Sequence, residues 1–141
     1  MIKRLLVAAL AIGLGGIARA ETVSDRPPVG LWLTEDGGGV IRIAPCGQNL
    51  CGSIAGQSAT GSDPPIAARC GLQILTVAPL RPGIWDGQIT NPEDGRVWNV
   101  QISQDTDGTL HLRGYIGLPL FGATQIWTQY AGRIGAGCRM G

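Results

Sequence analysis

The sequence predicts an all-β fold, a single small antiparallel barrel of eight strands, and two observations carry this prediction. Short segments rich in Ile, Val, Leu, Trp and Thr are separated by glycine and Asp-Gly turns, which is typical of a meandering antiparallel sheet. Glycine makes up 23 of the 141 residues, and each interior glycine costs a helix about 1 kcal/mol. The sequence therefore favours strands over helices along its whole length.

The expected strands lie at residues 31–34, 40–43, 50–55, 72–77, 83–90, 96–103, 109–116 and 123–129. In the first strand Leu31 and Leu33 alternate with Trp32, and the turn at residues 35–37, Glu-Asp-Gly, leads into the second. The third strand returns from the second across residues 47–50. These three strands are therefore expected to pair in chain order.

The other five strands follow residues 56–71, a segment of sixteen residues without strand character. Loops of that length are usually functional or loosely ordered. Alternation is sharpest in the sixth strand, where Trp98, Val100 and Ile102 share one face and Asn99 lies on the other. One buried and one wet face is what a closed barrel or a two-sheet sandwich requires.

The up-and-down strand order favours the barrel, because closure removes the exposed edges that an open sheet leaves. A β-sandwich is the alternative. The interior of an eight-stranded barrel is either filled by side chains or wide enough for one small ligand. The state of the interior therefore decides between a binding protein and a structural one.

The first twenty residues have the organisation of a secretory signal peptide. Lys3 and Arg4 precede an apolar run at residues 5–17, and Ala18-Arg19-Ala20 follows as a small-x-small cleavage site. The run is 13 residues long, whereas a transmembrane helix needs about 20. We expect cleavage after Ala20, a periplasmic or secreted protein, and one β-barrel domain at residues 21–141 without a transmembrane segment.

The charge of the cleaved chain argues against nucleic-acid binding. Cleavage removes Lys3, Arg4 and Arg19 and leaves eight basic residues, all arginine, against ten acidic ones, which is a net charge of −2. The arginines are scattered singly along the chain, so no basic patch of the kind that nucleic acids require is expected.

All four cysteines follow the predicted cleavage site, and an even number in an exported domain indicates two disulfides. Of the three possible pairings we favour Cys46 with Cys51, which flank a short connection, and Cys70 with Cys138. The loss of entropy in the unfolded chain predicts that the short bridge stabilises the fold by about 2 kcal/mol and the long one by about 4 kcal/mol. Zinc-ligand and redox-active spacings are missing from the sequence, so neither a metal nor a cofactor is expected.

Four sequence blocks occur in order along the chain. They are GLWLTEDG at residues 30–37, IAPCG with LCG at residues 43–47 and 50–52, NPEDG at residues 91–95, and RGYIGLPLFG with WT at residues 113–122 and 127–128. Together they resemble the signature of domain of unknown function 2147, a family of exported bacterial proteins, over about residues 29–129. Gly30 and Trp32 on the first strand also resemble the Gly-x-Trp pattern of lipocalin-like (calycin) barrels. Neither resemblance implies a chemical activity.

No catalytic constellation is expected from the sequence. His111 is the single histidine and falls on the predicted wet face without a serine or cysteine partner. Glu93 and Asp94 are adjacent acids, but turn chemistry explains the whole NPEDG segment. An enzyme is therefore not predicted.

The candidate ligand-binding residues are aromatic and apolar. We expect Trp32, Trp98 and Trp127 in the wall of any cavity, and Tyr115 adds a hydroxyl. Residues 117–122 form the tip of the last hairpin, with Leu118, Leu120 and Phe121 as its large apolar side chains. These three side chains plug the barrel, form the lid of a ligand site, or remain exposed as a docking patch.

Two functions of different class follow from these observations. The first is a binding module for a small apolar or amphipathic ligand, based on the eight strands, the Gly-x-Trp pattern and the apolar loop. The alternative is a filled barrel that docks on an envelope protein or other envelope component through residues 117–122.

Overall fold

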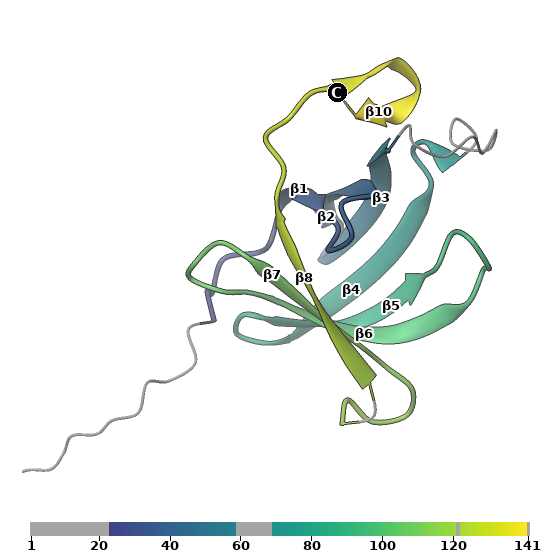
Figure 1. Cartoon of the computed structure of the whole chain (residues 1–141). Coiled ribbons are helices and arrows are strands. Elements are labelled where there is room, and N and C mark those ends of the chain that lie inside the picture. Colours follow the sequence, from purple (N-terminus) through teal and green to yellow (C-terminus); the bar gives the residue numbers. More distant parts are fainter. Residues whose placement is uncertain (1–22, 59–68, 121, 141) are drawn as a thin grey trace, which may run out of the picture.

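The computed structural model describes residues 23–58, 69–120 and 122–140, and these form a strand-rich barrel (Figure 1). The predicted signal peptide at residues 1–20 lies outside the described residues. The described residues contain no helix that is long and apolar enough to cross a membrane.

Eight strands build the barrel in the described part of the chain. They are β1 (Gly30–Leu33), β2 (Gly39–Cys46), β3 (Asn49–Gln57), β4 (Gln73–Arg81), β5 (Ile84–Thr90), β6 (Val97–Gln104), β7 (Leu110–Tyr115) and β8 (Gly122–Gln129). β2 and β4 run beyond their predicted ends through Pro45 and Pro79. Proline lacks the N–H that a strand ladder uses, but its fixed φ is compatible with extended backbone. The eight predicted strands are confirmed.

Every barrel strand pairs antiparallel with the next one along the chain, and β1 also pairs with β8. The first and last strands therefore close the sheet on itself, which confirms a barrel rather than a sandwich. The ladder between β1 and β8 is short: it pairs Trp32 with Gln129 and Leu33 with Thr128.

The C-terminal tail adds three short elements that the sequence did not predict: β9 (Ile134–Gly135), the 3-10 helix η2 (Ala136–Cys138) and β10 (Arg139–Met140). β3 and β4 pair only as far as Ser53 and Gln73, so the last residues of β3 extend past β4. β10 pairs in parallel with β3 at Gln57. The tail therefore covers the part of β3 that β4 leaves open (Figure 1).

The core consists of buried side chains from seven of the eight barrel strands, and the partly buried Trp85 and Ile89 of β5 pack against it. It contains Trp32, Ile41, Ile43, Leu50, Ile54, Ile74, Leu75, Val77, Val100, Ile102, Leu110, Leu112 and Trp127. The Trp32 indole N–H donates to the Pro28 carbonyl oxygen at 3.1 Å, so the N-terminal segment satisfies the one polar group of this buried side chain. The predicted alternation of Trp98, Val100 and Ile102 holds in β6, where the latter two are fully buried.

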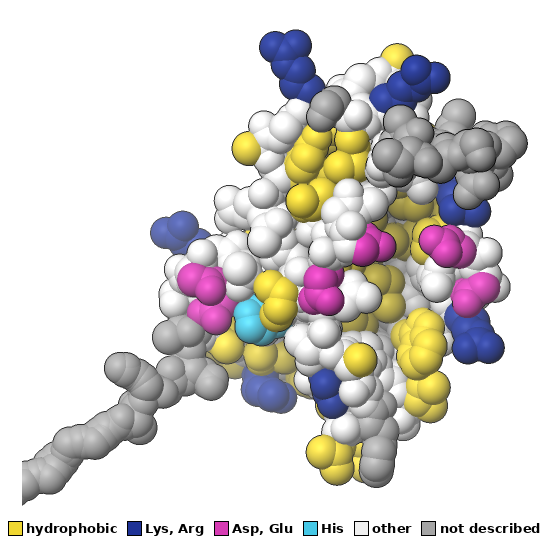
Figure 2. All heavy atoms as spheres, in the orientation of Figure 1, with side chains coloured by type: hydrophobic (Ala, Val, Ile, Leu, Met, Phe, Trp, Pro, Cys, Tyr) yellow, Lys and Arg dark blue, Asp and Glu magenta, His cyan; other side chains and the backbone are white. Residues whose placement is uncertain are grey.

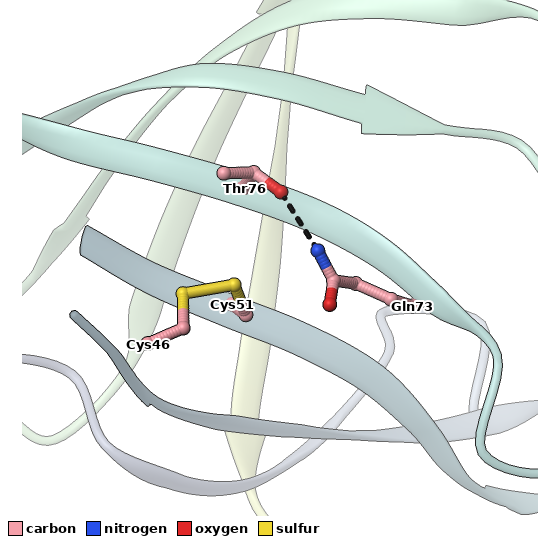
Figure 3. Close-up of a disulfide and its surroundings, with 4 residues drawn as sticks. All are labelled: Cys46, Cys51, Gln73 and Thr76. Carbon is pink, nitrogen blue, oxygen red and sulfur yellow. Dashed lines mark hydrogen bonds between the residues drawn. A yellow bond between two sulfur atoms is a disulfide. The ribbon is translucent and has the colours of Figure 1, made fainter.

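Both predicted disulfides are present. Cys46 and Cys51 join the ends of β2 and β3 with a Cα–Cα distance of 5.7 Å, and Cys70 joins Cys138 at 5.6 Å. Cys51 pairs with Thr76 of β4, which accepts a hydrogen bond of 3.0 Å from the Gln73 amide (Figure 3). The long bridge anchors the C-terminal tail next to the segment that leads into β4.

Candidate functional site: a cavity at one end of the barrel

A cavity of about 720 Å³ opens at one end of the barrel. The connections between β1 and β2, between β5 and β6, and the adjoining ends of β7 and β8 contribute to its lining, together with the end of β3. Figure 2 shows hydrophobic side chains inside the hollow and acidic side chains around its edge. Its volume lies in the range of small-molecule sites, which is roughly 300–1,000 Å³. The barrel is therefore not packed solid along its full length.

The deep part of the cavity is apolar. Its lining includes six core side chains from six different strands: Ile41, Ile54, Ile74, Val100, Leu112 and Trp127. Ile89 and Trp98 are only partly buried, and they extend the apolar wall toward the opening. The core side chains face inward in phase with the buried residues of their strands, and Ile89 of β5, a strand without a buried residue, lies opposite Leu75 and Trp98.

The β1–β2 turn brings two acids to the opening. Asp36 Oδ1 accepts hydrogen bonds from the Gly38 backbone N–H and the Thr34 hydroxyl, both at 2.8 Å. The Gly38 N–H, and then the Thr34 hydroxyl, hold the pKa of Asp36 below its usual value. The Asp36 carboxylate is therefore charged at neutral pH and stabilises the turn that positions it.

Glu35 in the same turn extends the contact between β1 and β8. Beyond Leu33 and Thr128 the ladder between these strands ends, and the Ile126 backbone N–H donates instead to Glu35 Oε1 at 2.8 Å. One carboxylate oxygen thus replaces a strand carbonyl, and the acid is held at the edge of the cavity.

The β5–β6 turn contributes Asn91, Pro92 and Glu93 to the opening. The Glu93 N–H donates to Asn91 Oδ1 at 2.8 Å, and the Arg96 N–H donates to Asp94 Oδ1 at 2.8 Å. The side chains of Asn91 and Asp94 therefore build the turn, as the sequence predicts. Glu93 differs from Asn91 and Asp94 because it contributes only its backbone N–H to these turn hydrogen bonds, and the residue lies at the edge of the cavity.

Gln57, near the end of β3, is a polar residue on the inward face. It lies opposite Gly39 of β2 and lines the cavity. Its Oε1 atom is buried and accepts no hydrogen bond from the described part of the chain. A buried acceptor without a donor costs about 1–3 kcal/mol, so such an atom needs an explanation.

The predicted aromatic residues divide between the cavity and its surroundings. Trp98 and Trp127 line the cavity, and the Trp127 indole N–H donates to Gln125 Oε1 at 2.9 Å. Trp32 is buried in the core and is not part of the lining. Two of the three tryptophans therefore lie where a ligand would meet them.

Tyr115 does not reach the cavity. It is one residue out of phase with Gly114, which lines the cavity, so the tyrosine lies on the opposite face of β7. Its hydroxyl donates to Asp86 Oδ1 at 2.9 Å. The hydrogen bond to Asp86, and then burial, raise the pKa of Tyr115. The prediction that this hydroxyl joins the cavity wall is wrong because of the strand phase.

The loop at residues 117–122 does not plug the barrel with either of its two leucines. Leu118 and Leu120 are 61% and 77% exposed and lie outside the lining. Phe121 lies outside the described residues. The Arg113 guanidinium donates to the carbonyl oxygens of Pro119 (2.8 Å) and Leu120 (3.2 Å). These bonds fix the turn backbone while the leucine side chains face solvent.

His111 lies away from the cavity. Its Nε2 atom is 3.7 Å from Asp105 Oδ2, a residue that follows the opposite end of β6. Among the described residues, no group of three or more His, Cys, Asp or Glu side chains is placed to hold a metal ion.

The sequence missed the polar members of the lining, although part of the signal was present. Gln57 is in phase with the inward-facing Ile54 of β3 once the bulge between them is counted. Gln125 is in phase with the inward-facing Trp127 of β8. A polar residue in phase with a buried face is a usable sign of a cavity, at least in β8, where the spacing from Gln125 to Trp127 is regular. Arg69, Glu35 and Glu93 come from connections, and only the closed barrel brings them to one opening.

Comparison with known proteins agrees with this architecture. A family model for uncharacterized proteins conserved in bacteria, DUF2147, matches residues 30–129. The chain belongs to this family. The DUF2147 match covers the barrel from the start of β1 to the end of β8. The resemblance inferred from the four sequence blocks is confirmed.

A solved structure shares the fold. It is described as "Protein HP1028 from the human pathogen Helicobacter pylori belongs to the lipocalin family". The TM-score is 0.59 with 11% sequence identity, and the match covers 74% of this chain and 84% of that chain. The DUF2147 barrel is therefore lipocalin-like in fold. No curated protein matches the sequence.

Proposed function

We propose that this protein is an exported binding protein that holds a small apolar or amphipathic molecule in the barrel cavity. The observation that carries the proposal is the cavity itself, about 720 Å³ in volume, with an apolar wall and an opening edged by polar groups. Sites of this kind bind ligands by burying apolar surface and fix their orientation with a few polar contacts.

The character of the lining supports an amphipathic ligand. Core side chains, Trp127 among them, surround the deep part, and the partly buried Trp98 extends this apolar wall. Gln57 lies at the end of β3, and Glu35 and Glu93 lie in the β1–β2 and β5–β6 turns. An apolar group gains about 25 cal/mol for each Å² that it buries. The polar end of the ligand then remains at the opening, where side chains and water solvate it.

Export is supported by the signal-peptide pattern at residues 1–20 and by the two disulfides. Disulfides persist in oxidising compartments such as the periplasm and the exterior. The expected processed form is residues 21–141, and the experiments below use this form in its oxidised state.

The test is binding of N-phenyl-1-naphthylamine, a neutral apolar probe that becomes fluorescent out of water. Gly114→Phe places a ring in the cavity, because a Cβ on Gly114 meets only the Asn99 carbonyl oxygen, at 4.0 Å. Ala78→Phe adds the same ring on the exposed outer side of β4 and serves as the control.

We expect the wild-type protein and Ala78→Phe to bind the probe alike, and Gly114→Phe to bind it at least about tenfold more weakly, which is 1.4 kcal/mol. Circular dichroism and urea unfolding establish that both variants are folded. Failure of the wild type to bind, or equal binding by the Gly114→Phe variant, contradicts the proposal.

A second function is favoured by the turn between β7 and β8. Ile116, Leu118 and Leu120 are 61–77% exposed, and the Arg113 hydrogen bonds hold the turn in one shape. A rigid exposed apolar tip fits docking on an envelope component. A photo-crosslinking residue in place of Leu120 is expected to give a defined adduct in intact cells, whereas one at Thr106, an exposed residue in another turn, gives none. If no adduct forms at either position, docking is contradicted.

A further inference from the structure

The opening of the cavity carries an excess of negative charge. Glu35, Asp36 and Glu93 contribute three carboxylates, and Arg69 contributes one guanidinium, which gives a net charge of −2. None of the three carboxylates forms an ion pair with any described residue. Residues 59–68, which precede Arg69, include Asp63 and no lysine or arginine, so their composition adds no compensating cation.

A hydrogen-bond acceptor without a donor lies beside these acids. Gln57 pairs with Gly39 at the end of the β1–β2 turn, and the Ser58 N–H donates to the Gly38 carbonyl oxygen at 3.0 Å. The same turn carries Glu35 and Asp36, so Gln57 lies on their side of the opening. Its Oε1 is buried without a partner among the described residues. Because Gln57 lines the cavity, a rotation of its side chain exposes this oxygen to a ligand N–H, which supplies the missing donor.

We propose that the ligand's polar head is a protonated amine with free N–H groups, and that its apolar tail occupies the cavity. This inference rests on the proposed binding function and specifies the ligand class. The carboxylates attract the positive charge, and the Gln57 oxygen accepts one N–H of the ammonium group. A carboxylate head meets a net negative opening, and a quaternary ammonium head has no N–H for Gln57.

Arg69 is the group that favours an anionic head instead. It is one cation against three carboxylates, and the Asp36 carboxylate is ionised because hydrogen bonds from Gly38 and Thr34 stabilise its charge. The field at the opening is therefore negative, and a buried tail keeps the head within that field. Because the opening is in contact with solvent, salt weakens the selectivity.

The test compares four molecules with the same dodecyl tail and different heads: dodecylamine, dodecyltrimethylammonium, dodecanol and dodecanoate. Each displaces N-phenyl-1-naphthylamine from the oxidised 21–141 protein at pH 7 and low salt, below the concentration at which it forms micelles. An alkylamine is protonated at this pH, as a lysine side chain is. We expect dodecylamine to bind about tenfold more tightly than dodecanoate and more tightly than the trimethylammonium compound.

The possible outcomes separate this inference from the proposed function. If none of the four molecules displaces the probe and the probe itself does not bind, the binding function fails. If all four bind alike, or dodecanoate binds best, the cavity binds ligands but the inference about the amine is overturned. Preference for both cations over dodecanoate without preference for the primary amine overturns the role of Gln57.

Three variants locate the selectivity. Glu35→Gln with Glu93→Gln removes two charges and keeps an acceptor for the Ile126 N–H, and it is expected to abolish most of the preference for dodecylamine over dodecanoate. Gln57→Met keeps the approximate shape and is expected to abolish only the preference over the trimethylammonium compound. Asp25→Asn with Asp107→Asn removes two acids outside the lining and is expected to leave both preferences intact. Equal effects of the two double variants contradict the inference.

Discussion

Gly87 lies in the middle of β5 at a point where β4 leaves no room for a side chain. A Cβ on this residue would lie 2.7 Å from Val77 Cα and closer still to the Thr76 carbonyl oxygen, both backbone atoms of β4. Real Cβ atoms essentially never approach within 3.0 Å of such atoms. Gly87→Ala must therefore move β4 away from β5, because no side-chain rotation relieves the contact.

The size of the effect follows from what this movement disrupts. A shift of about 1 Å stretches the hydrogen bonds of the β4–β5 ladder beyond useful length, and overpacking of this kind costs about 1–3 kcal/mol. Lost ladder hydrogen bonds add about 1 kcal/mol each. We expect Gly87→Ala to lower the free energy of unfolding by about 3 kcal/mol.

Gly114→Ala is the matched control, since Gly114 is also a strand glycine. Its Cβ would meet only the Asn99 carbonyl oxygen at 4.0 Å, so the methyl group fits without strain. Replacing glycine at a compatible position stabilises a protein by about 0.4–1 kcal/mol through the unfolded chain. The two alanine variants are thus expected to differ by about 3.5 kcal/mol.

The assay is urea unfolding of the oxidised 21–141 protein, followed by tryptophan fluorescence. With a slope of about 1.5 kcal/mol per molar urea, the midpoints of the two variants separate by about 2 M. Midpoints that agree within about 0.5 M would refute the steric reasoning and the close approach of β4 to β5.

Three further predictions concern stability. Replacing Cys70 and Cys138 by serine is expected to cost about 4 kcal/mol in urea unfolding, and removing the short bridge about 2 kcal/mol, because the long bridge spans 68 residues and the short one 5; equal losses contradict the entropic argument. Asp36→Ala is expected to lower the free energy of unfolding by about 1 kcal/mol at pH 7. Since the folded pKa of Asp36 is lowered, its charge stabilises the fold above about pH 4, and the difference from wild type shrinks as pH falls through that lowered pKa. A difference that persists undiminished in acid counts against this prediction. Tyr115→Phe is expected to lower the free energy of unfolding by about 1–2 kcal/mol. Because the hydrogen bond to Asp86 raises the pKa of Tyr115, the greater stability of the wild type is present below about pH 10 and declines as pH rises further. Unfolding at a series of alkaline pH values measures this decline, and a stability difference that grows in alkali contradicts the prediction.

Local pattern is enough to predict the strands and their order. Alternation in β6 places Trp98, Val100 and Ile102 on one face, and turn residues such as those at 91–95 separate the strands. The disulfides were predictable because Cys46 and Cys51 flank a short connection, which leaves one partner each for Cys70 and Cys138. These features depend on neighbours in the sequence, where the spacing of residues fixes the geometry.

The cavity and the chemistry of its opening depend on contacts between distant segments, which no local pattern contains. Glu35 and Ile126 meet, 91 residues apart, only because β1 pairs with β8. The turn at residues 117–122 is shaped over a shorter range, by hydrogen bonds from Arg113 to the Pro119 and Leu120 carbonyl oxygens, and its leucine side chains face solvent. Composition shows that these side chains are apolar, but barrel closure decides which of them face a ligand and which face solvent. The sequence by itself therefore determined the strands, their order and the bridges, while the tertiary structure decided the open interior and the acidic edge around it.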